Sequence, residues 1–89
     1  MTVLNKYKHI IPKDAVYIGR GSKWGNPFVI GKDGTRDEVV AKYYEWIISN
    51  PQLLNCLHEL VGKDLVCFCQ PLLCHGDVLE YLVDLYFNH

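Results

Sequence analysis

The chain has 89 residues, of which 49% are hydrophobic and 21% charged, and its formal net charge at pH 7 is -1. This composition is typical of one small globular domain, so we treat residues 1–89 as a single domain. A nearly neutral chain is not a general polycation, although this leaves nucleic acid open as a partner. No apolar run reaches the roughly 18 residues of a membrane span, and the first residues do not resemble a secretion signal. We therefore expect a cytoplasmic protein with no membrane partner.

Charge is distributed unevenly along the chain. Residues 1–35 carry six basic and two acidic side chains, whereas residues 36–89 carry three basic and eight acidic ones. A face formed by the first third would attract an anion. The alternative is a mixed, solvated surface without a ligand.

The first half of the chain predicts a strand, a loop and a helix. Residues 15–19 alternate and are rich in β-formers, residues 20–27 are rich in turn residues, and residues 28–30 predict a short strand. Thr35 and Glu38 form a capping box that opens a helix. The apolar face of this helix contains Val40, Tyr43, Tyr44, Ile47 and Ile48.

The second half predicts a helix, a strand and a final helix. Asn50 and Pro51 begin the first of these helices and Gly62 ends it. Its predicted stripe is Leu53, Leu54, Leu57, Leu60 and Val61. Residues 64–69 predict a buried strand. The final helix starts at Cys74 or His75 and reaches about Phe87. Its inward residues are predicted to be Val78, Leu79, Leu82, Val83 and Tyr86.

Strands separated by helices favour parallel pairing through crossover connections. We therefore predict an α/β fold: a small single domain with a short, mainly parallel sheet flanked by about three helices. In such sheets ligands bind beyond the carboxyl ends of the strands. The loop Arg20–Phe28 and the loop Cys69–Asp77 each follow a predicted strand. The fold is therefore expected to bring these two loops together.

The loop "GRGSKWGNPF" (residues 19–28) has the residue types of a ligand-binding segment. Arg20, Ser22 and Lys23 offer hydrogen-bond donors to an anion. Trp24 offers a flat face, and the Asn26 amide can donate and accept hydrogen bonds. Together these groups suit a nucleotide or nucleobase. The loop lacks both phosphate-binding glycine motifs, G-x-x-x-x-G-K-[ST] and G-x-G-x-x-G. The alternative interpretation is an ordered loop without a ligand, in which Trp24 fills the core.

The segment "LVCFCQPLLCHGD" (residues 65–77) concentrates cysteine and histidine. A zinc site would use Cys67, Cys69, Cys74 and His75. The C-x-C-x4-C-H spacing fits a zinc site poorly, because Cys74 and His75 are adjacent. We therefore expect no cofactor, with zinc as the alternative.

A reactive thiol is another interpretation of this segment. Cys74 lies where a helix begins, which favours a thiolate, and His75 is a candidate base. Cys69, at the end of the predicted strand, is a second candidate thiol. Cys67, in a buried strand, is better explained as a small apolar residue, and Cys56 is predicted to serve only packing.

Gly76 and Asp77 complete the candidate site. A glycine in the first helical turn suggests close approach by a ligand or by another loop. The Asp77 carboxylate either interacts favourably with the positive end of the helix dipole or binds a sugar hydroxyl or an amide. Catalytic roles are assigned to Cys74, His75 and Asp77. Gly76 is assigned to ligand binding.

The two segments together resemble a family of short phage and bacterial domains of unknown function. Members of that family read R-x-S-x-W-G-N-P-F near the start and C-W-C-x-P-x-x-C-H-G-D-V-L near the end. Here the matching stretches span residues 15–82, and Phe68 stands where tryptophan is common. The resemblance implies one compact domain in a viral or mobile-element setting, and hence a host cytoplasm. It implies no activity.

Three hypotheses follow for the function. In the first, the two loops form a pocket for a small phosphorylated or nucleotide-like ligand, and chemistry at a nucleobase–sugar bond is conceivable there. In the second, the protein is a small phage adaptor or inhibitor that binds a host protein. In the third, Cys67, Cys69, Cys74 and His75 hold zinc in a binding module. The sequence fixes neither the ligand nor the oligomeric state.

Overall fold

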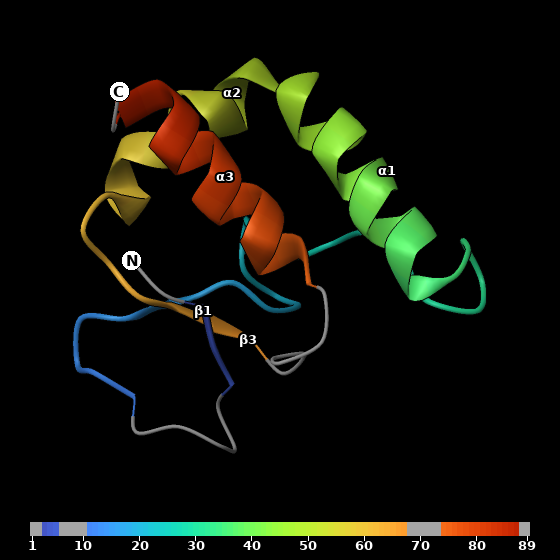
Figure 1. Ribbon diagram of the computed structural model, residues 1–89, viewed down its shortest axis with the longest axis horizontal. Helices are drawn as coiled ribbons and strands as arrows, with labels where there is room; N and C mark the ends of the chain where they lie inside the picture. The colour runs from blue at the N-terminus through green and yellow to red at the C-terminus, as the bar shows by residue number, and fades with distance from the viewer. Residues whose placement is uncertain (1–2, 6–10, 68–73, 88–89) are drawn as a thin grey trace.

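The structure is a computed structural model and describes residues 3–5, 11–67 and 74–87. Its elements in chain order are β1 (Val3–Asn5), β2 (Val16–Tyr17), α1 (Arg36–Ile48), α2 (Pro51–Leu54), the 3-10 helix η1 (Leu57–Leu60), β3 (Leu65–Cys67) and α3 (His75–Phe87). The predicted fold class is confirmed: this is a small α/β domain with a short parallel sheet and three α-helices (Figure 1).

The sheet has the order β1-β3-β2, and both outer strands run parallel to β3. Leu65 of β3 pairs with Val3 on one side and with Val16 on the other. Because all three strands run the same way, their carboxyl ends lie at one edge of the sheet. The ends of β2 and β3 therefore lie side by side at this edge. Most of the predicted loop Cys69–Asp77 lies outside the described residues.

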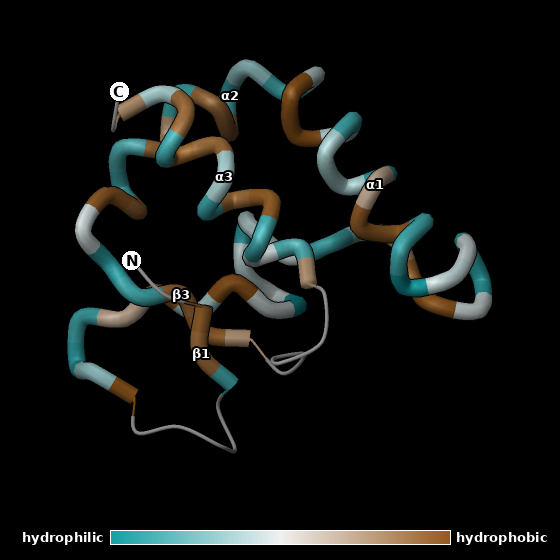
Figure 2. Tube along the Cα trace, in the orientation of Figure 1, coloured by the Kyte–Doolittle hydropathy of each residue, from teal (hydrophilic) through white to brown (hydrophobic). Residues whose placement is uncertain are grey.

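The core lies between the sheet and α3, with α1 packed against α3 (Figure 1). Hydrophobic and hydrophilic residues alternate along both helices (Figure 2). The most buried side chains include Ile18, Tyr43, Leu65, Leu79 and Leu82. α1 begins where predicted, because the Thr35 hydroxyl accepts the Glu38 N–H and the Glu38 carboxylate accepts the Thr35 N–H.

Residues 28–30 do not form the predicted strand. Val29 instead closes a tight turn: its N–H donates to the Asp33 carboxylate, and its carbonyl accepts the Asp33 N–H. Ile30 makes only an isolated bridge with Gly34. These hydrogen bonds within the turn thus take the place of the hydrogen bonds that pairing with another strand would make. In contrast, β1 was not predicted, because three residues are too few to show a pattern.

The helix predicted from Pro51 to Gly62 is divided into α2 and η1. Leu57 and Leu60 are three residues apart, and this spacing places both on one side of a 3-10 helix, where they are buried. Val61 and Tyr86, both predicted to face inward, are exposed because each lies at the end of its element. In the described part of the chain, no helix is long and apolar enough to cross a membrane.

Candidate functional site

A pocket of about 370 Å³ lies at the carboxyl edge of the sheet. It is bordered by the end of β2, by the loop that follows it, by the first part of α1, by the last residue of β3 and by the start of α3. Its volume lies within the roughly 300–1,000 Å³ of typical small-molecule sites. Parallel sheets typically bind ligands at this edge.

The lining of the pocket combines basic side chains with apolar ones. Its basic side chains are Arg20 and Arg36, and among the described residues that line it none is acidic. Two aromatic rings, those of Tyr17 and Phe28, also border it. The aliphatic wall consists of Val29, Ile30, Val39 and Val40. A pocket with this lining favours an anion that also carries an apolar or planar part.

Asn26 fixes the loop in place beside α1. Its side-chain amide donates to the Val39 carbonyl at 3.2 Å, and its amide oxygen accepts the Phe28 N–H at 2.9 Å. The guanidinium of Arg20 lies 3.5 Å from the Asn26 carbonyl oxygen. Asn26 therefore borders the pocket as predicted, but both ends of its amide already have partners within the protein.

Trp24 belongs to the hydrophobic core rather than to the pocket lining. Only 2% of its surface is exposed, and its carbonyl accepts a 2.7 Å hydrogen bond from the Tyr43 hydroxyl. Burial raises the pKa of that hydroxyl, so Tyr43 stays a neutral donor. The structure therefore shows the alternative interpretation, in which Trp24 fills the core, and not a flat face offered to a ligand.

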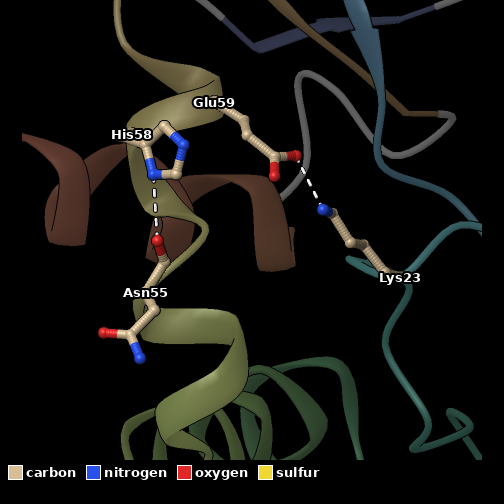
Figure 3. Close-up of polar contacts among 4 residues, drawn as sticks. All are labelled: Lys23, Asn55, His58 and Glu59. Atoms are coloured by element: carbon tan, nitrogen blue, oxygen red, sulfur yellow. Dashed lines mark hydrogen bonds and ion pairs between the residues drawn. The ribbon is translucent and has the colours of Figure 1, made fainter.

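Lys23 and Ser22 also make bonds within the protein. The Lys23 ammonium lies 2.7 Å from a carboxylate oxygen of Glu59, on η1 (Figure 3). On the same 3-10 helix, the His58 ring lies 2.9 Å from the Asn55 carbonyl (Figure 3). The Ser22 hydroxyl donates to the Gly19 carbonyl at 2.7 Å. Neither Lys23 nor Ser22 lines the pocket, so of the three predicted anion donors the structure places only Arg20 there.

His75 lines the pocket from the first position of α3. Its Nε2 lies 2.6 Å from the Ile18 carbonyl oxygen. A carbonyl only accepts, so Nε2 carries the proton and Nδ1 has a free lone pair. Burial lowers the pKa of His75, and the nearby charge of Arg20 lowers it further, while the Ile18 carbonyl and Asp77 oppose the shift. The imidazole is therefore neutral at pH 7.

Two cysteine sulfurs lie beside this imidazole. Cys74 Sγ is 3.2 Å from Cys67 Sγ and 3.6 Å from His75 Nδ1, and it accepts the Gly76 N–H at 3.3 Å. Both cysteines are buried, and both line the pocket. Cys74 and His75 are adjacent in the chain, and their side chains meet in the structure while the Ile18 carbonyl holds the other side of the ring.

Asp77 and Gly76 support the start of α3. The Asp77 carboxylate accepts the Cys74 N–H at 3.0 Å, and in the structure Asp77 does not line the pocket. A Cβ on Gly76 would lie 2.8 Å from methyl carbons of Ile18 and Val3. The glycine therefore permits close packing of α3 on the sheet. The atoms that approach it belong to β1 and to the residue after β2, and not to a crossing loop.

The zinc hypothesis involves a residue outside the described part of the chain, because Cys69 lies in the range 68–73. In the part that the structure describes, no group of three or more His, Cys, Asp or Glu side chains is arranged to hold a metal ion. Cys56 packs partly buried against the core, as predicted.

Sequence reasoning missed Arg36, Tyr17 and Phe28 as pocket residues. Arg36 follows the helix cap at Thr35, and no spacing motif connects it with Arg20. Its place in the pocket depends on how α1 crosses the end of the sheet. A larger but more open hollow, of about 900 Å³, runs along α1 and the start of α2, and it holds none of the cysteine and histidine cluster.

The chain belongs to the family described as Domain of unknown function (DUF4326), whose model matches residues 3–85. It is similar to the "Uncharacterized 12.4 kDa protein in nrdA-td intergenic region" of Enterobacteria phage T4, with 37% identity over 91 residues, which cover 97% of this chain and 80% of that protein. It is also similar to the "Uncharacterized protein R718" of Acanthamoeba polyphaga mimivirus, with 34% identity over 94 residues, 85% of this chain and 72% of that protein. No solved structure matches the chain.

These comparisons confirm a family of unknown function that occurs in phage and viral proteins. The consensus sequences of the two family motifs stay a prediction.

Proposed function

We propose that the pocket binds a small phosphorylated ligand of the nucleotide class. The observation that carries the proposal is the pairing of two arginines with two aromatic rings in one pocket that has no acidic residue among its described lining. Arg20 and Arg36 would hold the phosphate, because guanidinium groups bind phosphate through paired hydrogen bonds. The planar part would lie against Tyr17, Phe28 and the aliphatic wall.

The ligand is expected to need both its phosphate and its base. A bare phosphate would leave the apolar wall uncovered, and a nucleoside would lack the phosphate that the two arginines are proposed to bind. In a pocket of about 370 Å³ the two parts lie close enough for one small molecule to satisfy both. The proposal concerns binding, and any reaction at the nucleobase–sugar bond stays a prediction.

The test is isothermal titration at low salt with the four common ribonucleoside 5'-monophosphates. The matching nucleosides and inorganic phosphate serve as partial ligands. At least one monophosphate should bind, and both of its parts alone should bind at least about tenfold more weakly, since a charge-assisted hydrogen bond contributes roughly 1.5–3 kcal/mol. No binding of any monophosphate would contradict the proposal.

Variants locate the binding. Arg20→Gln and Arg36→Gln should each weaken binding about 10- to 100-fold, by the same energy of a charge-assisted bond. Lys23→Gln is the matched control: it removes a positive charge from the same loop, but Lys23 pairs with Glu59 outside the pocket lining. Equal losses in all three variants would indicate general charge attraction and would contradict the assigned pocket.

The adaptor hypothesis stays a prediction beside this proposal. It differs in what it requires of the pocket: a host protein bound elsewhere on the surface would not depend on Arg20 or Arg36. The zinc-module hypothesis also stays a prediction, and the metal content of the purified protein bears on it directly.

A further inference from the structure

The thiols of Cys67 and Cys74 are placed to react with each other. Their sulfurs are 3.2 Å apart, and each side chain is 1% exposed. A disulfide has a sulfur separation of about 2.05 Å, so the two atoms need to approach by only about 1 Å. Cys67 ends the central strand, and Cys74 directly precedes α3, so each is positioned by a regular element.

The surroundings of Cys74 favour its thiolate over that of Cys67. The Gly76 N–H donates to its sulfur at the amino end of a 13-residue helix, where the helix dipole stabilises negative charge. His75 Nδ1, the unprotonated ring nitrogen, lies 3.6 Å from the sulfur and can take its proton. Cys74 is therefore the attacking thiol and Cys67 the resolving one.

Access to both thiols is through the pocket, which both residues line. Because the side chains are otherwise buried, only a small reagent that enters the pocket can reach them. Disulfides in a reducing compartment are typically transient or redox-sensing rather than structural.

We propose that Cys67 and Cys74 are a redox-active dithiol pair, which a small disulfide that enters the pocket oxidises reversibly. The Cys74 thiolate attacks one sulfur of the small disulfide, forms a mixed disulfide and releases the first thiolate, which takes up the proton that Cys74 lost. The Cys67 thiolate then attacks Cys74 Sγ and releases the second thiolate, which takes up the Cys67 proton. Two protein thiols are thereby oxidised to one disulfide, and one small disulfide is reduced to two thiols.

The experiment treats the reduced full-length chain with excess hydroxyethyl disulfide and follows its intact mass. The expected product is lighter by two hydrogens, carries no hydroxyethylthio group, and returns to the starting mass with dithiothreitol. Chymotrypsin cleaves after Phe68 and after Leu73, which places Cys67, Cys69 and Cys74 on three separate peptides. Mapping of the non-reduced chain therefore identifies the bonded pair.

Matched variants assign the two roles. Cys67→Ala should stop at a stable mixed disulfide on Cys74, because the resolving thiol is missing. Cys56→Ala keeps both Cys67 and Cys74 and should therefore be oxidised like the native chain. Circular dichroism checks that each variant is folded. If Cys67→Ala does not fold, peptide mapping of the native chain by itself tests whether Cys67 and Cys74 form the disulfide. Four unreacted thiols, a bond through Cys56 or Cys69, or zinc bound in equal amount to the purified chain would overturn the proposal.

Discussion

The glycine-rich loop of residues 19–28 and the start of α3, residues 74–77, both contain clusters of chemically versatile residues, but the structure uses them differently. In the loop, Trp24 lies in the core and Lys23 pairs with Glu59. At the start of α3, Cys74 and His75 both line the pocket. The difference teaches that a cluster of binding-type residues does not by itself mark a binding surface. The partners that each polar atom already has decide which residues are left for a ligand.

Removing the Trp24 side chain should have the largest effect on stability. Trp24→Ala is expected to lower the free energy of unfolding by about 3–5 kcal/mol, because it leaves a large cavity in the core. A domain of this size typically has only about 5–15 kcal/mol in total. Urea unfolding measures the change. Far-UV circular dichroism is a suitable signal, because it does not depend on the tryptophan that the variant lacks.

The adjacent residue is the control for Trp24. Lys23→Ala removes an exposed ion pair and should leave the free energy of unfolding nearly unchanged, because exposed ion pairs contribute little to stability. Similar losses for both variants would mean that the loop acts as a unit, and the division into core and surface residues would be wrong.

Two glycines allow a steric comparison between the regions. A Cβ on Gly25 would lie 2.8 Å from the Gly19 carbonyl oxygen, a backbone atom, whereas a Cβ on Gly76 would meet only side-chain methyl groups. Gly25→Ala is therefore expected to cost about 1–3 kcal/mol. Gly76→Ala should cost less, because side chains shift more easily and because alanine is favoured over glycine in a helix by roughly 0.5–1 kcal/mol. The reverse order in thermal melts would contradict this account of α3 packing.

The bond between Tyr43 and the loop is expected to have a smaller effect. Tyr43→Phe keeps the ring in the core but removes the hydroxyl that donates to the Trp24 carbonyl. The expected loss is about 0.5–1.5 kcal/mol, the usual net value of such a hydrogen bond. Chemical denaturation of the variant gives this value, and no measurable loss would show that the loop does not depend on α1 through this bond.

The smallest predicted effect is a pH dependence from His75. Its pKa in the folded state lies below the ordinary value of 6.5, mainly through burial. The unfolded state therefore binds a proton first as the pH falls through 6.5, and the stability supplied by the neutral ring is lost below that value. The groups around the ring are Arg20, Asp77, Tyr43 and Cys74.

His75→Gln isolates this contribution. The native chain should lose more stability than the variant between about pH 7 and about pH 5, the range in which histidine titrates. Glu38 and Glu59 do not interfere, because their pKa values are lowered below the ordinary 4.5 by hydrogen bonds to Thr35 and Lys23. Parallel pH profiles for the two proteins would contradict a buried neutral His75.

The sequence was sufficient to predict the α/β class, the capping box of α1, the start of α3 and the parallel pairing of the strands. These features depend on local signals or on the handedness of parallel connections. The roles of Trp24 and Arg36 were not predictable in this way. Trp24 is suited equally to a core and to a ligand, and only its burial in the folded chain, where 2% of its surface is exposed, shows which applies. Arg36 reaches the pocket through the packing of α1.

The most direct test of the central claim is an NMR titration of the isotope-labelled chain with the monophosphate that binds best by calorimetry. The account predicts shifts in the amide signals of Gly19, Arg20, Ile30, Arg36 and His75, with little change at Lys23 or Glu59. Loss of these shifts in Arg36→Gln would complete the assignment. Shifts confined to the open hollow along α1 and α2, or no shifts at all, would contradict a nucleotide-binding pocket at the carboxyl edge of the sheet.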